Sequence, residues 1–116
     1  MRALVRHFIS PDINLDDFRP EDSADFSFLL QALVGPDDSE GEESLQFLVC
    51  TPRALERRVA SEKLIFGRSL VVVESPDIPQ ILNAVRGAVE RAEAPSWSEL
   101  ARYLERLGVY EFEAYS

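Results

Sequence analysis

The stretch GPDDSEGEESLQFLVCTP, residues 35–52, constrains the fold more than any other part of the chain. Its second half alternates apolar Leu45, Phe47 and Val49 with other side chains, which is the period of two expected of a strand with one buried face. Residues 25–34, DFSFLLQALV, show the same period, and the Gly-Pro pair that follows predicts the end of that strand. The two strands therefore form a hairpin. The carboxylates of the turn between them are Asp37, Asp38, Glu40, Glu42 and Glu43.

The segments on either side of this hairpin predict two further strands and a first helix. Residues 3–9 form a short run with β-branched side chains, typical of a strand. Thr51-Pro52 begins a helix that runs to about residue 62, because threonine caps a helix and proline is tolerated at the first helical position. Leu55 and Val59, four residues apart, are expected on its buried side. Residues 66–74, FGRSLVVVE, predict a fourth strand, of which residues 70–73 are expected to be buried.

Two apolar stripes predict helices after residue 74. Ser75-Pro76-Asp77 opens the first helix, in which apolar residues recur at i, i+3, i+4 and i+7. Ser96 caps the second helix, Glu99 completes a capping box and Gly108 ends the helix. The stripes consist of Ile78, Ile81, Leu82, Val85 and Val89, and of Trp97, Leu100, Ala101, Leu104 and Leu107.

The order β-β-β-α-β-α-α predicts an α+β fold, with a mainly antiparallel sheet and helices packed on one face. The alternating C-terminal residues, VYEFEAYS, can add an edge strand. Residues 1–116 are expected to form a single domain, because a chain of this length supports one hydrophobic core.

The negative charge of the chain is concentrated in one segment. The net charge is −9, and residues 12–43 contain eleven carboxylates and one basic residue, Arg19. The rest of the chain holds eleven basic and ten acidic residues, so the whole excess belongs to residues 12–43. Clustered carboxylates accelerate association with a basic partner and disfavour nucleic acid and anionic membranes. The alternative is a solvated surface that keeps a small domain soluble.

Few residues point to catalysis, to a metal or to a cofactor. His7 is the only histidine and lies in a predicted strand, where a packing role is the simpler interpretation. Cys50 is the only cysteine and has no neighbouring histidine to activate its thiol. The acidic turn does not have the ligand spacing of a calcium-binding loop, and phosphate-loop, Rossmann, zinc and nucleophile-elbow spacings do not occur. We therefore expect no catalytic residues, no cofactor and no metal site.

The sequence also predicts a cytoplasmic location. No run approaches the roughly 18 apolar residues that a membrane span needs. The N-terminus has no apolar region of the kind found in a signal peptide, because Arg6 and His7 interrupt it. A single cysteine cannot form an internal disulfide, which suits a reducing compartment.

The C-terminus provides a second set of candidate binding residues. Tyrosine offers a large contact area with a polar tip, and is therefore common at interfaces. The alternative is that Tyr110 and Phe112 close the core while the glutamates face water. The candidates for partner binding in this region are Tyr110, Glu111, Glu113 and Tyr115.

Several motifs, taken together and in order, resemble the immunity protein 8 family of bacterial polymorphic toxin systems. They are SPD at residues 10–12, RPED at 19–22, GP at 35–36, GEES-x-x-F-x-VCTP at 41–52, FGR at 66–68, Trp97 with Glu99, and YEFE at 110–113. The resemblance implies a non-enzymatic inhibitor that stays in the cytoplasm and binds the domain of a cognate toxin. The acidic segment would suit a toxin with a basic substrate-binding cleft, such as a nuclease.

Two other functions remain open at this point. One is a small enzyme or metal-dependent domain that uses His7 with carboxylates. The other is a structural interaction subunit, for which a large exposed apolar patch would be diagnostic.

Overall fold

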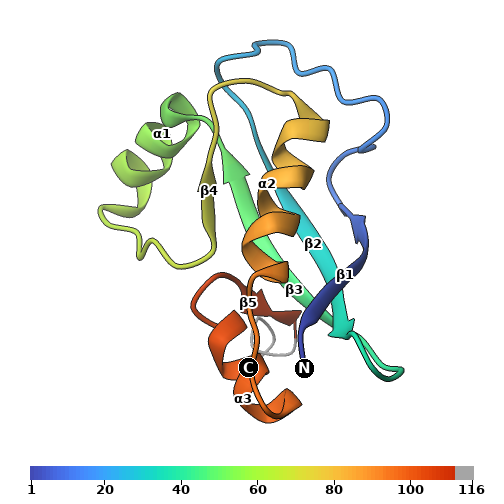
Figure 1. Cartoon of the computed structure of the whole chain (residues 1–116). Coiled ribbons are helices and arrows are strands. Elements are labelled where there is room, and N and C mark those ends of the chain that lie inside the picture. Colours follow the sequence, from blue (N-terminus) through green and yellow to red (C-terminus); the bar gives the residue numbers. More distant parts are fainter. Residues whose placement is uncertain (112–116) are drawn as a thin grey trace.

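The predicted hairpin forms the centre of a mixed sheet. In the computed structural model, which describes residues 1–111, β2 (Ser27–Pro36) pairs with β3 (Glu43–Cys50) in antiparallel register from Ser27↔Cys50 to Val34↔Glu43 (Figure 1). The Gly35-Pro36 pair ends the first of these strands, as predicted, and forms its last two residues. β1 (Ala3–Ile9) pairs with β2 up to Pro36, because Ala3 lies opposite Pro36 and extends the ladder to that residue.

The far edge of the sheet is formed by two short strands that both pair with β3. β4 (Leu70–Val72) runs parallel to β3 after the crossover through α1 (Pro52–Glu62), as a parallel neighbour requires. β5 (Val109–Tyr110) pairs with β3 in the antiparallel sense and confirms the predicted edge strand over these two residues. The sheet order is β1-β2-β3-β4. The prediction that residues 70–73 are buried was wrong, because β4 is an edge strand, and Val72 is 50% exposed.

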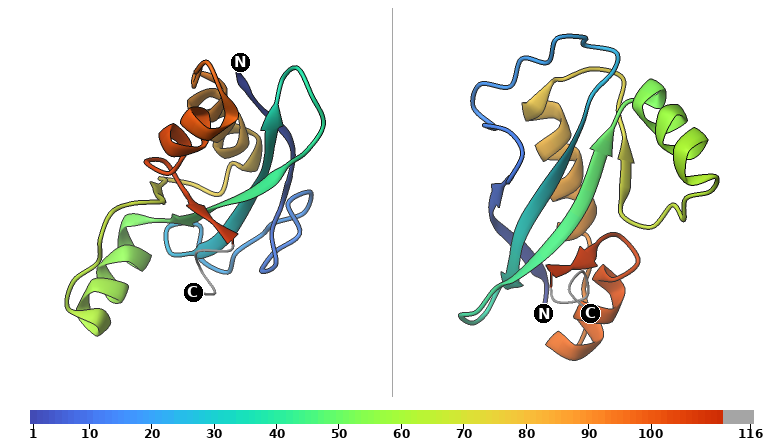
Figure 2. Two further views of the ribbon diagram at one scale, coloured as in Figure 1. Left: turned by 90° about the horizontal axis from the view of Figure 1, so that it is seen from below. Right: turned by 180° about the vertical axis from the view of Figure 1, so that it is seen from behind.

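α2 (Ile78–Glu90) and α3 (Trp97–Leu104) supply the helical side of the core, as their apolar stripes predict (Figure 2). The side chain of Asp77 caps α2 by accepting from the Gln80 N–H, and Ser96 caps α3 by accepting from the Glu99 N–H. The fully or nearly fully buried residues that these helices and the hairpin contribute to the core are Phe28, Leu30, Ala32, Val34, Leu45, Phe47, Val49, Ile78, Ile81, Val85, Val89, Leu100 and Leu104.

The bounds predicted for α1 are confirmed, but its predicted buried side was wrong. Thr51 caps the helix and is itself fully buried. Its buried hydroxyl also accepts from the Phe26 N–H at 3.1 Å. Ala54 is the buried residue of α1, whereas Leu55 is half-buried and Val59 is 39% exposed. The four-residue spacing identifies the apolar side of α1, yet α1 provides none of the described residues of the core cluster.

The second face of the sheet lies opposite α2 and α3. The pairing of β2 with β3 places Leu29 beside Leu48, Gln31 beside Gln46, and Leu33 beside Ser44 on this face. Within residues 1–111, no helix lies in front of these two strands when the molecule is viewed from behind (Figure 2). We call this surface the helix-free face.

Candidate partner-binding site

The acidic turn, residues 37–43, is an exposed and strongly charged feature of the molecule. It connects β2 to β3 and projects beyond the end of the sheet (Figure 1). All seven residues are exposed, including all five predicted carboxylates. The structure therefore presents Asp37, Asp38, Glu40, Glu42 and Glu43 together on one projecting loop, as the sequence predicts.

Contacts from Arg6 of β1 and from Arg2, which precedes β1, hold the base of the turn. The Arg6 guanidinium donates from Nη2 to the carbonyl oxygens of Pro36 and Ser39, at 2.8 and 2.9 Å. The Arg2 N–H donates to Asp37 Oδ1 at 3.0 Å, and the Asp37 N–H donates to the Arg2 carbonyl at 2.9 Å. Arg6 was missed by sequence reasoning, because nothing in the sequence indicates that a residue of the first strand reaches the turn.

Two glycines permit the shape of the turn. Gly41 has φ of +110°, a conformation that side chains with a Cβ rarely adopt. At Gly35, a Cβ would lie 2.2 Å from the Gly41 carbonyl oxygen and 2.8 Å from Arg6 Nε. The chain therefore folds closely back over Gly35, and only glycine leaves room for that approach.

Trp97 lies beside the acidic turn. A cavity of about 390 Å³ is lined by Trp97 of α3, by Pro36 and by residues 39–43 of the turn. The ring is half-buried and also packs against the core. Sequence reasoning placed Trp97 in an apolar stripe and among the family motifs, but not beside the turn, because the two are far apart along the chain. An aromatic ring next to carboxylates suits the side chain of arginine or lysine, which the ring face and the negative charges both attract.

The other carboxylates of the acidic segment differ from those of the turn because several are paired. Asp22 pairs with Arg53, Asp25 pairs with Arg57, and Asp17 pairs with Arg19. Within residues 1–111, no lysine or arginine side chain forms an ion pair with a carboxylate of the turn. The turn therefore retains charge that a basic partner can neutralise.

The hydrogen bond from Arg57 and its positive charge lower the pKa of the Asp25 carboxyl below its ordinary value, although partial burial opposes this shift. The same pair raises the pKa of Arg57. Both residues link α1 to the segment before β2, which identifies them as structural rather than partner-binding residues.

The C-terminal candidates do not all lie on the described surface. Tyr110 is 2% exposed, and its hydroxyl donates to the Ala101 carbonyl of α3 at 2.9 Å. Tyr110 therefore closes the core, which was the alternative to a partner-binding role for this residue. Glu111 is half-buried, and Glu113 and Tyr115 lie outside the described residues.

The residues considered for catalysis are separated in space. His7 is exposed on β1 and lies opposite Leu33, on the helix-free face. Cys50 is buried at the end of β3, and burial raises the pKa of its thiol, which disfavours the reactive thiolate. Residues 1–111 contain no group of three or more His, Cys, Asp or Glu side chains placed to hold a metal ion.

Comparison with known protein families assigns the chain to a family. The described residues combine an α+β fold with an exposed acidic loop. The model of the family described as Immunity protein 8 matches residues 3–115, and the chain therefore belongs to that family. Membership implies a toxin-neutralising role and a cognate toxin as the partner, and such families are generally non-enzymatic. No curated protein and no solved structure matches the chain. No helix in the part of the chain that the structure describes is long and apolar enough to cross a membrane.

Proposed function

We propose that this protein neutralises a cognate toxin domain by binding a basic region of that domain through the acidic turn. The supporting observation is the exposure of all five carboxylates on one loop that Arg6 and Asp37 hold in place. A loop that is already ordered loses little conformational entropy on binding, so its charge contributes more to association.

The chemistry of the partner follows from that of the turn. Its carboxylates can replace the phosphates of a nucleic acid in a basic cleft, so a nuclease toxin is the partner class that this surface fits best. Trp97 adds an aromatic face on which an arginine or lysine of the toxin can stack. The complex would form in the cytoplasm, and the single, buried Cys50 is compatible with a reducing compartment.

The test measures binding to the toxin domain encoded immediately upstream of this protein, at about 50 mM and about 500 mM salt. The variant Asp38→Asn/Glu40→Gln/Glu42→Gln neutralises the tip and leaves Asp37, which holds the turn, in place. We expect the variant to raise the Kd at low salt by about threefold to a hundredfold, since each of the three exposed ion pairs contributes about 0.2–1 kcal/mol. Its Kd should also depend less on salt than that of the wild type.

The matched control is Glu74→Gln/Glu93→Gln/Glu105→Gln, which removes the same charge from exposed residues outside the turn. It should bind nearly as well as the wild type at both salt concentrations. Equal losses in the two triple variants would assign the effect to net charge alone. Unchanged binding in the turn variant would exclude the acidic turn as the contact.

A further inference from the structure

We propose that the toxin interface extends from the acidic turn along the helix-free face to an apolar groove, where the ring of Phe66 is the main apolar anchor. The inference rests on the proposed function and adds a second contact with different chemistry. The partner that it fits is a toxin surface in which a basic region borders an apolar pocket.

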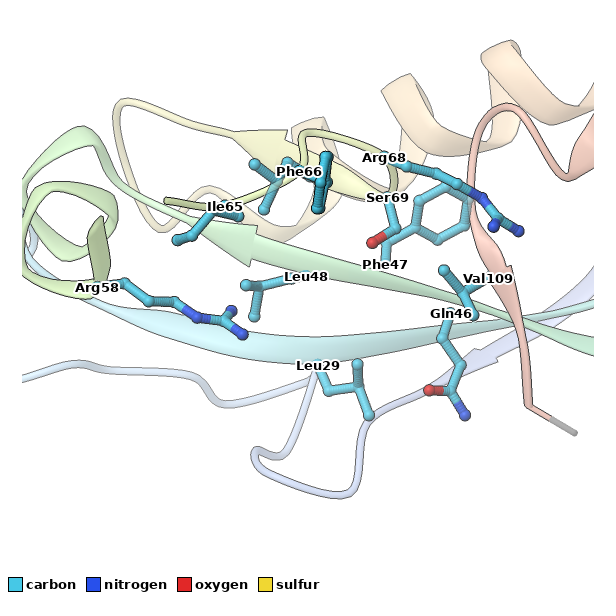
Figure 3. Close-up of a pocket in the computed structure, with 11 residues that line it drawn as sticks. Leu29, Gln46, Phe47, Leu48, Arg58, Ile65, Phe66, Arg68, Ser69 and Val109 are labelled. Carbon is cyan, nitrogen blue, oxygen red and sulfur yellow. The ribbon is translucent and has the colours of Figure 1, made fainter. Parts of the chain in front are cut away.

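The groove lies between the sheet and the loop that follows α1. Its volume is about 300 Å³, and its apolar lining includes Leu29, Leu48, Ile65 and Phe66. Figure 3 shows Leu48, Ile65 and Phe66 gathered along one side of β3, with Arg58 at one end of the groove and Arg68 at the other. The groove is therefore an apolar depression on the side of the molecule that the helices of the core leave open.

Phe66 is unusually exposed for an aromatic residue in a folded domain. Phe66 is 86% exposed, and Leu64, two residues earlier in the same loop, is 64% exposed. The loop begins after Lys63 and ends at Ser69, and both of these residues have positive φ, 74° and 72°. At Lys63 this conformation ends α1, whereas at Ser69 it is costly for a residue other than glycine, and such residues gather at functional segments. Apolar side chains clustered on the surface are typical of protein interaction sites.

The hairpin connects this groove directly to the acidic turn. Leu33 and Ser44 lie on the helix-free face near the turn, and Leu29 and Leu48 lie further along the same face at the groove. At about 3.4 Å per residue, Leu48 is about 17 Å along β3 from Glu43. A standard interface of about 800 Å² per partner spans about 30 Å. One toxin domain can therefore cover both the turn and the groove.

The two contacts would contribute differently to binding. Exposed charge pairs mainly accelerate association and select the partner, whereas buried aromatic anchors supply most of the affinity. The cations at the groove do not cancel the acidic turn. Arg58 already pairs with Glu62 at 2.5 Å, and the separation from the turn exceeds the Debye length of about 8 Å at physiological salt.

The experiment compares Phe66→Ala with Tyr103→Ala for binding to the same upstream-encoded toxin domain, at low and high salt. Tyr103 is a matched control, because it is a 52% exposed aromatic residue on α3 and does not line the groove. We expect Phe66→Ala to raise the Kd about tenfold or more at both salt concentrations, and Tyr103→Ala to leave it unchanged. Phe66→Leu should recover part of the affinity. Thermal unfolding should be little changed, since the ring of Phe66 is mostly in water.

Each result bears on the inference separately from the proposed function. Unchanged binding in Phe66→Ala would overturn the groove contact, while a salt-dependent loss in the acidic-turn variant would retain the proposed function. A loss in Phe66→Ala without any effect of the acidic-turn variant would support the groove and exclude the turn. Self-association of the wild type that Phe66→Ala abolishes, with toxin binding unchanged, would assign the groove to a second copy of the chain. If the wild type does not bind the toxin, both proposals are wrong.

Discussion

At the scale of single residues, carboxylates close together in the sequence have different roles. Asp25 pairs with Arg57 and has a lowered pKa, so it stabilises the fold. Asp37 combines two roles, because it is exposed and also accepts from the Arg2 N–H. Asp38, Glu40 and Glu42 are exposed and form no ion pair within the described part of the chain. Their negative charge is therefore available for a partner.

The Asp25–Arg57 pair predicts a pH dependence of stability. Because the pKa of Asp25 is lower in the folded state than its ordinary value of 3.8, the unfolded state binds more protons in the window between the two values. The stabilisation is therefore fully present above about pH 4 and is lost as the pH falls through the folded pKa. Arg57→Gln should lower the free energy of unfolding at neutral pH and differ less from the wild type at about pH 2.5.

Urea unfolding at a series of pH values provides this measurement, and the difference between the two proteins removes the contribution of other carboxyl groups. Arg91→Gln is a suitable control, since Arg91 is exposed and forms no ion pair within residues 1–111. A difference between wild type and Arg57→Gln that is constant with pH would contradict the assigned role of Asp25.

At the scale of secondary structure elements, the β2–β3 hairpin joins the core to the proposed interface. One of its faces packs against α2 and α3, its other face is the helix-free face, and its tip is the acidic turn. The shape of the tip depends on the close approach of Gly41 to Gly35 and on the hydrogen bonds from Arg6. The packing of the hairpin against the core therefore fixes where the carboxylates of the acidic turn lie.

This dependence predicts that Gly35→Ala displaces the acidic turn. The added Cβ would collide with the Gly41 carbonyl oxygen and with Arg6, so we expect a destabilisation of about 1–3 kcal/mol. The Kd for the toxin domain should rise by about tenfold or more, because the displaced carboxylates of the turn lose their contacts with the toxin. Urea unfolding and a binding assay measure the two effects.

The control for this substitution is Gly87→Ala in α2, where a Cβ would meet no atom within 4 Å. This change should stabilise the protein by about 0.5–1 kcal/mol, because alanine favours a helix over glycine, and should leave binding unchanged. If Gly35→Ala binds as tightly as the wild type, the conformation of the turn is not needed for recognition.

At the scale of the whole molecule, charge and apolar surface occupy different regions. Residues 12–43 carry the whole net negative charge. Residues 52–72 contain five basic and two acidic residues and include Val59, Leu64, Phe66 and Val72, which are exposed. The molecule thus presents an acidic end for attraction and an apolar region for close contact. An exposed apolar region was the feature expected of a structural subunit, and here it occurs together with the acidic turn.

This separation predicts that the two variants change different rate constants. The acidic-turn variant should lower the association rate about tenfold at low salt and have a small effect on dissociation. Phe66→Ala should mainly accelerate dissociation, because short-range apolar contacts act after the encounter. Stopped-flow or surface-based kinetics with the upstream-encoded toxin domain can separate the two rates. The opposite partition would contradict the division of roles.

The family, the order of the elements and the position of the acidic turn could all be predicted from the amino-acid sequence. Alternation in the hairpin, the capping residues Thr51 and Ser96, the opening of α2 at Ser75-Pro76-Asp77, and the apolar stripes of α2 and of α3 up to Leu104 are local signals, and the structure confirms them. These signals could be predicted because hydrogen bonding and side-chain direction within a helix or strand depend on neighbours a few residues away.

Tertiary structure alone decided which apolar surfaces are covered. The spacing of Leu55 and Val59 and the apolar run of β4 indicate amphipathic or extended segments, but not whether another element packs on them. The positions of Arg6 and Trp97 beside the acidic turn, and of Phe66 beside Leu48, depend on contacts between residues far apart in the chain. Burial is a property of the packed molecule, because removing a side chain from water requires a neighbour that only the whole fold provides.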